Sequence, residues 1–191
     1  FLSLHYPFVR RIQSSRPFAH RPRLLYKPKL RFLLVYNPSG DLPGTEEEAT
    51  AISELLQQYP DRFEVECFAG ADCRRLSFLS ALSEADIFHY AGHAYFRPDR
   101  PEESGLVLAD GPIFATELGN YLADRSPFFV FLNACESSAF GSHRMVIAGE
   151  EMASVAHPFI NGGSRAVLGS SLPVGDPQAA RFATAVYRGL I

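Results

Sequence analysis

The sequence is poor in the features that mark secreted and membrane proteins. It has three cysteines in 191 residues, an odd number without regular spacing, which provides no disulfide framework and indicates a reducing compartment. No apolar run approaches the roughly 20 residues of a membrane-spanning helix, and no signal-peptide pattern opens the chain. We therefore expect a cytoplasmic protein that has no membrane partner.

Motifs for metals, phosphates and other cofactors are also missing. Cys67 and Cys73 lack the spacing of zinc ligands, and no further ligands accompany His89 and His93. The glycine-bearing turn at residues 40–44 lacks the lysine and the spacing of a phosphate-binding loop. The sequence predicts no metal site and no cofactor.

Acidic residues are missing from the start of the chain. Residues 1–31 hold eight Lys and Arg and no Asp or Glu, although the whole chain has a net charge of −3. Four prolines interrupt residues 1–29, so we expect a basic extended arm there, or a lead-in from an upstream domain. Such an arm could bind nucleic acid, but contact with its own acidic domain is the better interpretation, and we expect nucleic acid to be only an indirect partner.

Apolar strand-like runs alternate with helical patterns over residues 30–191. With 47% hydrophobic and 20% charged residues, this part has the composition of one globular domain. The alternation predicts an α/β fold with a mainly parallel sheet and helices on both faces. Strands are expected at 30–36, 62–68, 85–94, 105–109, 128–136 and 165–169, and helices after Thr45 and after Asp72 and at 115–123, 149–160 and 176–191.

Local patterns also predict how the helices begin and which faces they bury. Thr45 and Glu48 match a capping box at the start of the first helix. The remaining predictions concern apolar residues at helical spacing. The inner faces are expected to consist of Ala49, Ile52, Leu55, Leu56 and Tyr59 in the first helix, Leu76, Leu79 and Leu82 in the second, and Phe182, Val186 and Leu190 in the last.

Two apolar strands end in residues that can do chemistry together. The strand at 85–94 ends at His93, and the strand at 128–136 ends at Cys135. In open α/β sheets, ligands collect at the carboxyl ends of the strands. If the two strands are parallel neighbours, His93 and Cys135 emerge at the same edge of the sheet.

A cysteine nucleophile needs its thiolate, and a nearby histidine both favours the thiolate and protonates the leaving amine. We predict that Cys135 attacks, that His93 is the acid and base, and that the backbone N–H groups of Ala94 and Cys135 hold the oxyanion. Gly92 would leave room for backbone and substrate. Taken singly, each residue is better interpreted as a buried core residue; the pair of complementary strand ends, each flanked by small residues, favours catalysis.

Longer stretches around these strand ends resemble a known family. His89-Tyr90-Ala91-Gly92-His93-Ala94 and Leu132-Asn133-Ala134-Cys135-Glu136-Ser137 resemble the paired signatures of the CHAT family, which are caspase-like (clan CD) cysteine peptidases. The resemblance covers residues 30–191. It extends to Leu30–Val35 with Asn37-Pro38, to Gly105–Leu108 with Asp110, to Phe159–Val167 and to Pro173–Asp176.

The resemblance implies a caspase-like three-layer sandwich and a cysteine endopeptidase that cuts a protein or peptide substrate, with His93 and Cys135 as the dyad. It also implies control by an upstream sensor domain or an activating protein. Because the chain stops at Ile191, before family members usually end, we expect an excised domain. The alternative is a catalytically silent scaffold or interaction module.

The specificity pocket is less clearly indicated. Relatives that cut after basic residues carry an acid two positions before the nucleophile, where this chain has Asn133. Asn133, Glu136 and Asp110 are the predicted pocket residues. The segment 136–148 has no periodic pattern, and in caspase-like enzymes the corresponding region rearranges or is cut on activation. We expect it to be disordered or closed over the site until a partner binds, with a plain surface loop as the alternative.

Overall fold

The computed structural model describes residues 27–97, 99–123, 125–136, 148–169 and 176–191. The basic arm up to residue 26 and the segment 137–147 after Cys135 lie outside the described residues, so the predictions made for them are not addressed. Two short 3₁₀ turns, at Gly70–Asp72 and Pro101–Glu103, accompany the main elements. These are β1 (Leu30–Tyr36), α1 (Gly44–Gln57), β2 (Phe63–Ala69), α2 (Arg75–Glu84), β3 (Ile87–Tyr95), β4 (Gly105–Leu108), β5 (Gly111–Phe114), α3 (Ala115–Tyr121), β6 (Phe129–Glu136), α4 (Ala148–Asn161), β7 (Ala166–Gly169) and α5 (Asp176–Leu190).

Five parallel strands form the body of the sheet. They lie in the order β2-β1-β3-β6-β7, and all neighbouring pairs are parallel. An antiparallel hairpin of β4 and β5 joins the carboxyl end of β3, where Ala94 pairs with Leu106 and Tyr95 with Gly105. The sequence expectation of a mainly parallel sheet is confirmed.

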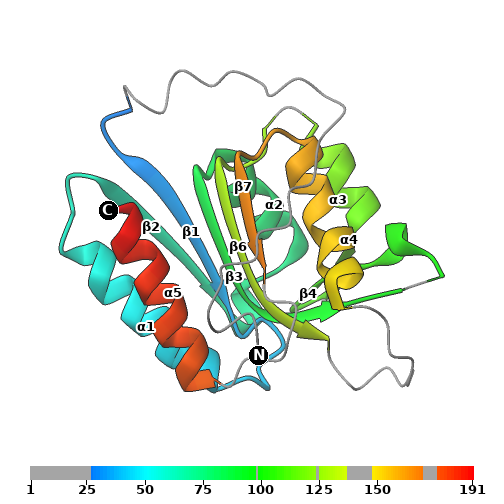
Figure 1. Ribbon diagram of the computed structural model, residues 1–191, viewed down its shortest axis with the longest axis horizontal. Coiled ribbons are helices and arrows are strands. Elements are labelled where there is room, and N and C mark those ends of the chain that lie inside the picture. Colours follow the sequence, from blue (N-terminus) through cyan, green and yellow to red (C-terminus); the bar gives the residue numbers. More distant parts are fainter. Residues whose placement is uncertain (1–26, 98, 124, 137–147, 170–175) are drawn as a thin grey trace, which may run out of the picture.

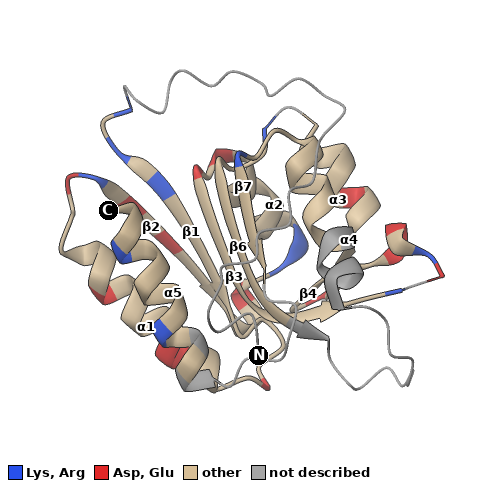
Figure 2. Cartoon of the chain, viewed as in Figure 1, with Lys and Arg blue, Asp and Glu red and all other residues tan. Residues whose placement is uncertain are grey.

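Helices cover both faces of this sheet, which makes a three-layer α/β sandwich. Figure 1 shows α1 and α5 side by side on one face and α2, α3 and α4 on the other. The central strand β3 contains no Lys, Arg, Asp or Glu, and Figure 2 places the charged residues on helices, loops and other strands such as β1 and β2. Strands buried on both faces require such apolar sequences.

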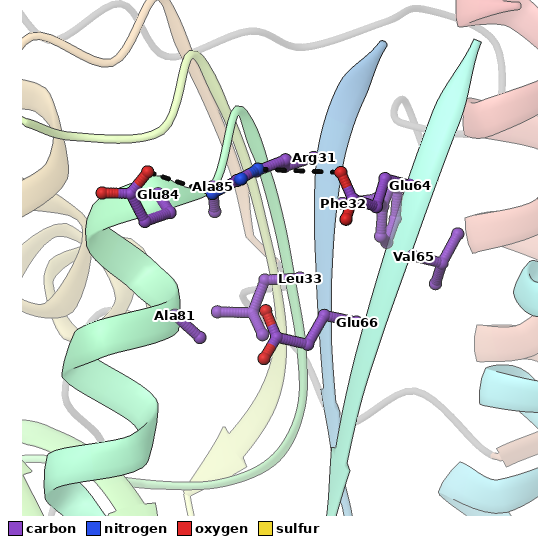
Figure 3. A pocket seen from close by; sticks show the side chains of 9 residues that line it. All are labelled: Arg31, Phe32, Leu33, Glu64, Val65, Glu66, Ala81, Glu84 and Ala85. Carbon is purple, nitrogen blue, oxygen red and sulfur yellow. Dashed lines mark hydrogen bonds and ion pairs between the residues drawn. The ribbon is translucent and has the colours of Figure 1, made fainter. Parts of the chain in front are cut away.

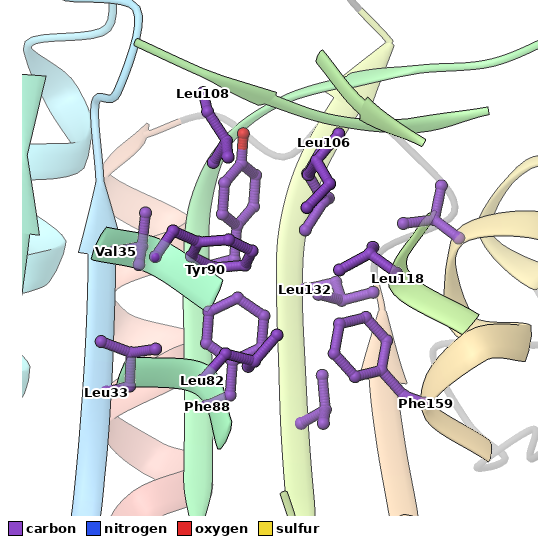
Figure 4. Packing of buried hydrophobic residues seen from close by; sticks show 14 of the residues in the cluster. Leu33, Val35, Leu82, Phe88, Tyr90, Leu106, Leu108, Leu118, Leu132 and Phe159 are labelled. Carbon is purple, nitrogen blue, oxygen red and sulfur yellow. The ribbon is translucent and has the colours of Figure 1, made fainter. Parts of the chain in front are cut away.

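Each side of the sheet has its own hydrophobic core. The core under α2, α3 and α4 is built around Phe88, Tyr90 and Phe159, as Figure 4 shows. The core under α1 and α5 contains Phe131 and Tyr187. Successive residues of β3 point to opposite faces, so Phe88 and Tyr90 enter the first core while Ile87 and His89 enter the second.

Several local predictions are wrong because tertiary packing overrode the sequence pattern. The capping box is absent, since Thr45 Oγ1 donates to the Leu42 carbonyl and Glu48 is buried. Residues 111–114 form β5, a strand that the sequence did not reveal. Among the described strands β5 pairs with β4, and it contains just four residues, too few for a clear period.

The inner faces of the helices also differ from prediction. Tyr59, assigned to the inner face of the first helix, lies beyond the end of α1 and is exposed. In α2, Leu76 is 82% exposed and Phe78 is fully buried. In α5, Phe182 and Leu190 are exposed, and Ala183 and Tyr187 face the core. Both helices carry apolar residues on more than one face, so spacing alone could not decide which face the sheet would cover. No helix in the described part of the chain is long and apolar enough to span a membrane.

Candidate active site

The carboxyl ends of β3 and β6 bring the two predicted catalytic residues together. The strands are adjacent and parallel, and their register pairs His93 with Cys135 and Ala94 with Glu136. Neighbouring strands of a sheet are about 4.8 Å apart. The backbone therefore places His93 and Cys135 directly opposite each other at one sheet edge, as their sequence positions predicted.

His93 is held by a carboxylate that the sequence analysis did not select. Asp41, in the loop between β1 and α1, has both side-chain oxygens 3.1 Å from His93 Nε2. Its carboxylate is mostly exposed, and the imidazole is about one-fifth exposed. The contact fixes one ring nitrogen and leaves Nδ1 as the nitrogen for proton exchange with another group.

The loop that carries Asp41 is organised by its own side chains. Asn37 adopts a left-handed conformation, with φ of 45°, and its Oδ1 accepts a hydrogen bond from the Leu42 N–H at 2.8 Å. The Asn37 N–H donates to the Ala91 carbonyl of β3, which ties the loop to the histidine strand. Ser39 Oγ donates to Asp41. The hydrogen bond from Ser39, and then the one with His93, lower the pKa of the Asp41 carboxyl below its ordinary value of 3.8.

The backbone at His93 is fixed from the opposite face of the sheet. Tyr90 Oη lies 2.7 Å from the His93 carbonyl and 2.8 Å from that of Val107, so its hydroxyl joins β3 to β4. Complete burial raises the Tyr90 pKa well above 10, which keeps this donor protonated. A Cβ at Gly92 would lie 2.6 Å from Tyr90 Oη and 3.0 Å from Pro38 Cδ. The space at Gly92 is thus occupied by the tyrosine and the proline.

The three predicted pocket residues lie in different surroundings. Asn133 is half-buried on β6, two residues before Cys135, and its Nδ2 donates to Glu48 Oε2 at 2.7 Å. Glu136 follows Cys135 at the end of the same strand. Asp110 lies in the turn between β4 and β5, where its carboxylate accepts hydrogen bonds from the Arg75 N–H at the start of α2. Asp110 thus caps a helix, and a role for any of the three in a substrate pocket stays a prediction.

The two other cysteines are poor nucleophiles. Cys73 is fully buried, and its burial raises the thiol pKa to about 12. Cys67 lies on β2 at the edge of the sheet, where partial desolvation also raises its thiol pKa. Since the thiolate is the reactive form, neither residue competes with Cys135 as a candidate nucleophile.

A pocket of about 360 Å³ lies away from these strand ends. Figure 3 shows it between α2 and the strands β1 and β2, with Leu33 and Ala81 on its apolar wall. At its rim Arg31 forms ion pairs with Glu84 at 3.0 Å and with Glu64 at 3.7 Å. Leu33 and Ala81 belong to the core under α2, α3 and α4, whereas Glu48 and His89 lie on the side of the sheet that α1 and α5 cover. No group of three His, Cys, Asp or Glu within the described ranges is arranged to hold a metal ion.

A mainly parallel sheet between two helical layers, with a histidine and a cysteine at adjacent strand ends, defines a caspase-like α/β domain. The chain belongs to the CHAT domain family, whose family model matches residues 3–191. The family assignment made from the two strand-end motifs is therefore confirmed.

Structural comparison supports the same class. The chain is similar to a chain in the crystal structure of the Saccharomyces cerevisiae separase–securin complex, with a TM-score of 0.53 and 18% sequence identity. The similarity covers 87% of this chain and 10% of that one, so the protein spans about a tenth of the separase–securin chain that it matches. At this identity the likeness establishes the fold. No curated protein matches the sequence.

Two residues of the site region were not identified from the sequence. Asp41 follows the Asn37–Gly40 turn at the carboxyl end of β1, and the rule that ligands gather at such ends could have marked it as a candidate. Glu48 was assigned to a helix cap. Its actual partners lie 41 and 85 positions away in the sequence, and no local pattern indicates them.

Proposed function

We propose that this domain is a cysteine endopeptidase that acts on a protein or peptide substrate, with Cys135 as nucleophile and His93 as its acid and base. The observation that carries the proposal is the β3–β6 register, which pairs the two residues at the carboxyl edge of the sheet. Membership of the CHAT family supports this chemistry.

The proposed reaction uses the two ring nitrogens of His93 differently. Nε2 is held by Asp41, so Nδ1 takes the proton of the Cys135 thiol. The thiolate attacks the scissile carbonyl, and the N–H groups of Ala94 and Cys135 stabilise the oxyanion. Collapse of this intermediate breaks the C–N bond, and His93 gives its proton to the leaving amine. Water, deprotonated by His93, then hydrolyses the acyl-enzyme and restores the thiol.

The proposal includes control by a second protein or by an upstream sensor domain. Its support is the family resemblance. The separase structure to which this chain is similar contains securin as a partner, which is a property of separase. A comparison of cleavage by the domain alone with cleavage in the presence of candidate partner proteins or sensor domains tests the control.

Mass-spectrometric labelling with a library of peptidyl electrophiles tests the chemistry. We expect selective modification of Cys135 that depends on the peptide and is lost in His93→Ala, and the preferred peptide reports the specificity pocket. Slow modification of Cys135 that does not depend on the peptide and is the same in both proteins would instead support the alternative, a catalytically silent caspase-like module.

A further inference from the structure

A buried polar network, formed by side chains of four residues, connects the two strands of the proposed dyad with both helices on that face of the sheet. His89 Nδ1 on β3 lies 2.8 Å from Tyr187 Oη on α5, and His89 Nε2 lies 3.3 Å from Glu48 Oε1 on α1. Glu48 Oε2 accepts the hydrogen bond from Asn133 Nδ2 on β6 at 2.7 Å. Four elements thus meet through Tyr187, His89, Glu48 and Asn133.

The centre of this polar network is shielded from solvent. The His89 and Glu48 side chains are 0% and 1% exposed, and Tyr187 is 2% exposed. Among the described residues, His89 Nε2 and Glu48 Oε1 are the buried side-chain atoms that form no regular hydrogen bond, and they face each other. Because a buried carboxylate is costly without a partner, Glu48 depends on both His89 and Asn133.

The hydrogen-bond donors and acceptors in the polar network can be assigned consistently. A carboxylate only accepts hydrogen bonds, so Asn133 must present its Nδ2 to Glu48 and His89 must carry a hydrogen on Nε2. Burial, and then the charge of Glu48, raise the pKa of Tyr187 well above 10. Its hydroxyl therefore stays protonated and can donate to His89 Nδ1 when the ring is neutral.

We propose that Glu48 and His89 are positioning residues for the dyad. Glu48 fixes Asn133, two residues before Cys135 on β6, and His89 fixes Glu48 from a point four residues before His93 on β3. The network thereby sets where the two strand ends lie relative to each other. This inference depends on the proposed function for its catalytic consequence, although its structural part can be measured separately.

A role in positioning differs from a role in stability alone. A buried ionic pair is commonly no more stabilising than apolar side chains of similar volume. Buried polar networks instead fix one arrangement of the groups that they join. Here the fixed residue, Asn133, is two residues before the proposed nucleophile on the same strand. A displacement of a catalytic group by about 1 Å can lower the reaction rate by on the order of 100-fold.

The test compares three variants of the 191-residue chain with the wild type. Glu48→Ala removes the carboxylate that contacts both His89 and Asn133. Glu48→Gln keeps its shape, because the Gln oxygen can accept from Asn133 while its amide donates to the alternative tautomer of His89. Leu56→Ala is the matched control, since Leu56 is equally buried on the same helix and in the same core but makes no polar contact.

Two readouts are measured on each protein. The first is kcat and KM with a peptide substrate built on the sequence that best labels Cys135. We expect Glu48→Ala to lower kcat by roughly 10- to 100-fold with little change in KM, and Glu48→Gln to restore most of the loss. The second is the ¹⁵N–¹H spectrum, in which the backbone amides of His93 and Cys135 should shift in Glu48→Ala but not in Leu56→Ala.

The outcomes separate this inference from the proposed function. Shifts at His93 and Cys135 in Glu48→Ala, together with a wild type that cleaves nothing and labels independently of His93, would uphold the positioning and reject the peptidase. Unchanged amide signals in Glu48→Ala would overturn the positioning whatever the activity. Equal losses of kcat in Glu48→Ala and Leu56→Ala would reduce the network to a stabilising role and also overturn it.

Discussion

Asp41 places both carboxylate oxygens 3.1 Å from His93 Nε2, so a residue of the β1–α1 loop orients the imidazole at the end of β3. The two residues are 52 positions apart in the sequence. The contact is exposed on the Asp41 side, which limits its strength. In the proposed mechanism, this contact selects the ring nitrogen that remains for proton transfer.

Removal of this carboxylate should slow the proposed reaction moderately. For Asp41→Ala we expect a loss of about 1 kcal/mol in transition-state stabilisation, or roughly five-fold in kcat/KM, because an exposed charged hydrogen bond is partly screened. The measurement is the steady-state rate on the peptide substrate. Asp99→Ala is the control, since Asp99 is also exposed and paired, but with Arg97. Equal rates for wild type and Asp41→Ala would remove Asp41 from the mechanism.

The pKa of Asp41 should depend on Ser39. Because the Ser39 hydroxyl is the largest cause of its lowered pKa, Ser39→Ala should move the Asp41 pKa upward, toward 3.8. A ¹³C NMR titration of the side-chain carboxyl measures this shift. The Asp99 pKa, which is lowered by Arg97, should stay constant and serves as the internal reference.

The same lowered pKa has a consequence for stability. A carboxyl whose folded pKa lies below its unfolded value stabilises the fold above the unfolded pKa, here about 3.8. That contribution is lost as the pH falls through the lower folded value. The wild type should therefore lose more stability than Asp41→Asn in acid denaturation below about pH 4, and parallel curves would contradict the assignment.

The close packing at Gly92 predicts a sharp contrast between two glycines. Gly92→Ala forces a methyl group against the Tyr90 hydroxyl, so we expect a loss of about 1–3 kcal/mol and a lower Tm. Gly119, in α3, has open space around its Cβ position, and Gly119→Ala should stabilise by about 0.5–1 kcal/mol through helix propensity. Denaturant unfolding measures both. Similar effects of the two substitutions would argue against the packing at Tyr90.

The buried face of α2, which contains Phe78 and not Leu76, can be checked by measuring the free energy of unfolding of two variants. Phe78→Ala should destabilise by about 3–5 kcal/mol because the ring is fully buried against Phe88. Leu76→Ser should change stability by less than about 0.5 kcal/mol, since Leu76 is exposed. The reverse order would restore the face that the apolar spacing predicted.

Cys73 should report the opening of the fold. Its thiol is buried and its pKa is about 12, so a maleimide at pH 7 should modify it only when α2 and its surroundings open. Because the folded pKa is raised, the stability from Cys73 is complete below its unfolded pKa near 9 and declines as the pH rises toward 12. Rapid modification of Cys73 in the native protein would contradict this burial.

Sequence by itself predicted six of the seven described strands, most helix positions and the parallel sheet, and it predicted the pairing of His93 with Cys135 on the condition that their strands are neighbours. These features follow from short-range patterns: continuous apolar runs specify strands buried on both faces, and adjacent parallel strands bring their carboxyl ends together. The two strand-end motifs were sufficient to assign the CHAT family. Helix faces were predicted less well, because α2 and α5 offer more than one apolar face.

Tertiary structure alone decided which polar groups meet. Glu48 fits a helix cap by local sequence, yet the fold buries it between His89 and Asn133. The fold also brings the Asp110 carboxylate to the start of α2, and Asp41 reaches His93 because the β1–α1 loop is tied to β3. Partners of buried and loop polar groups depend on contacts between distant segments, and these contacts exist only once the layers have packed.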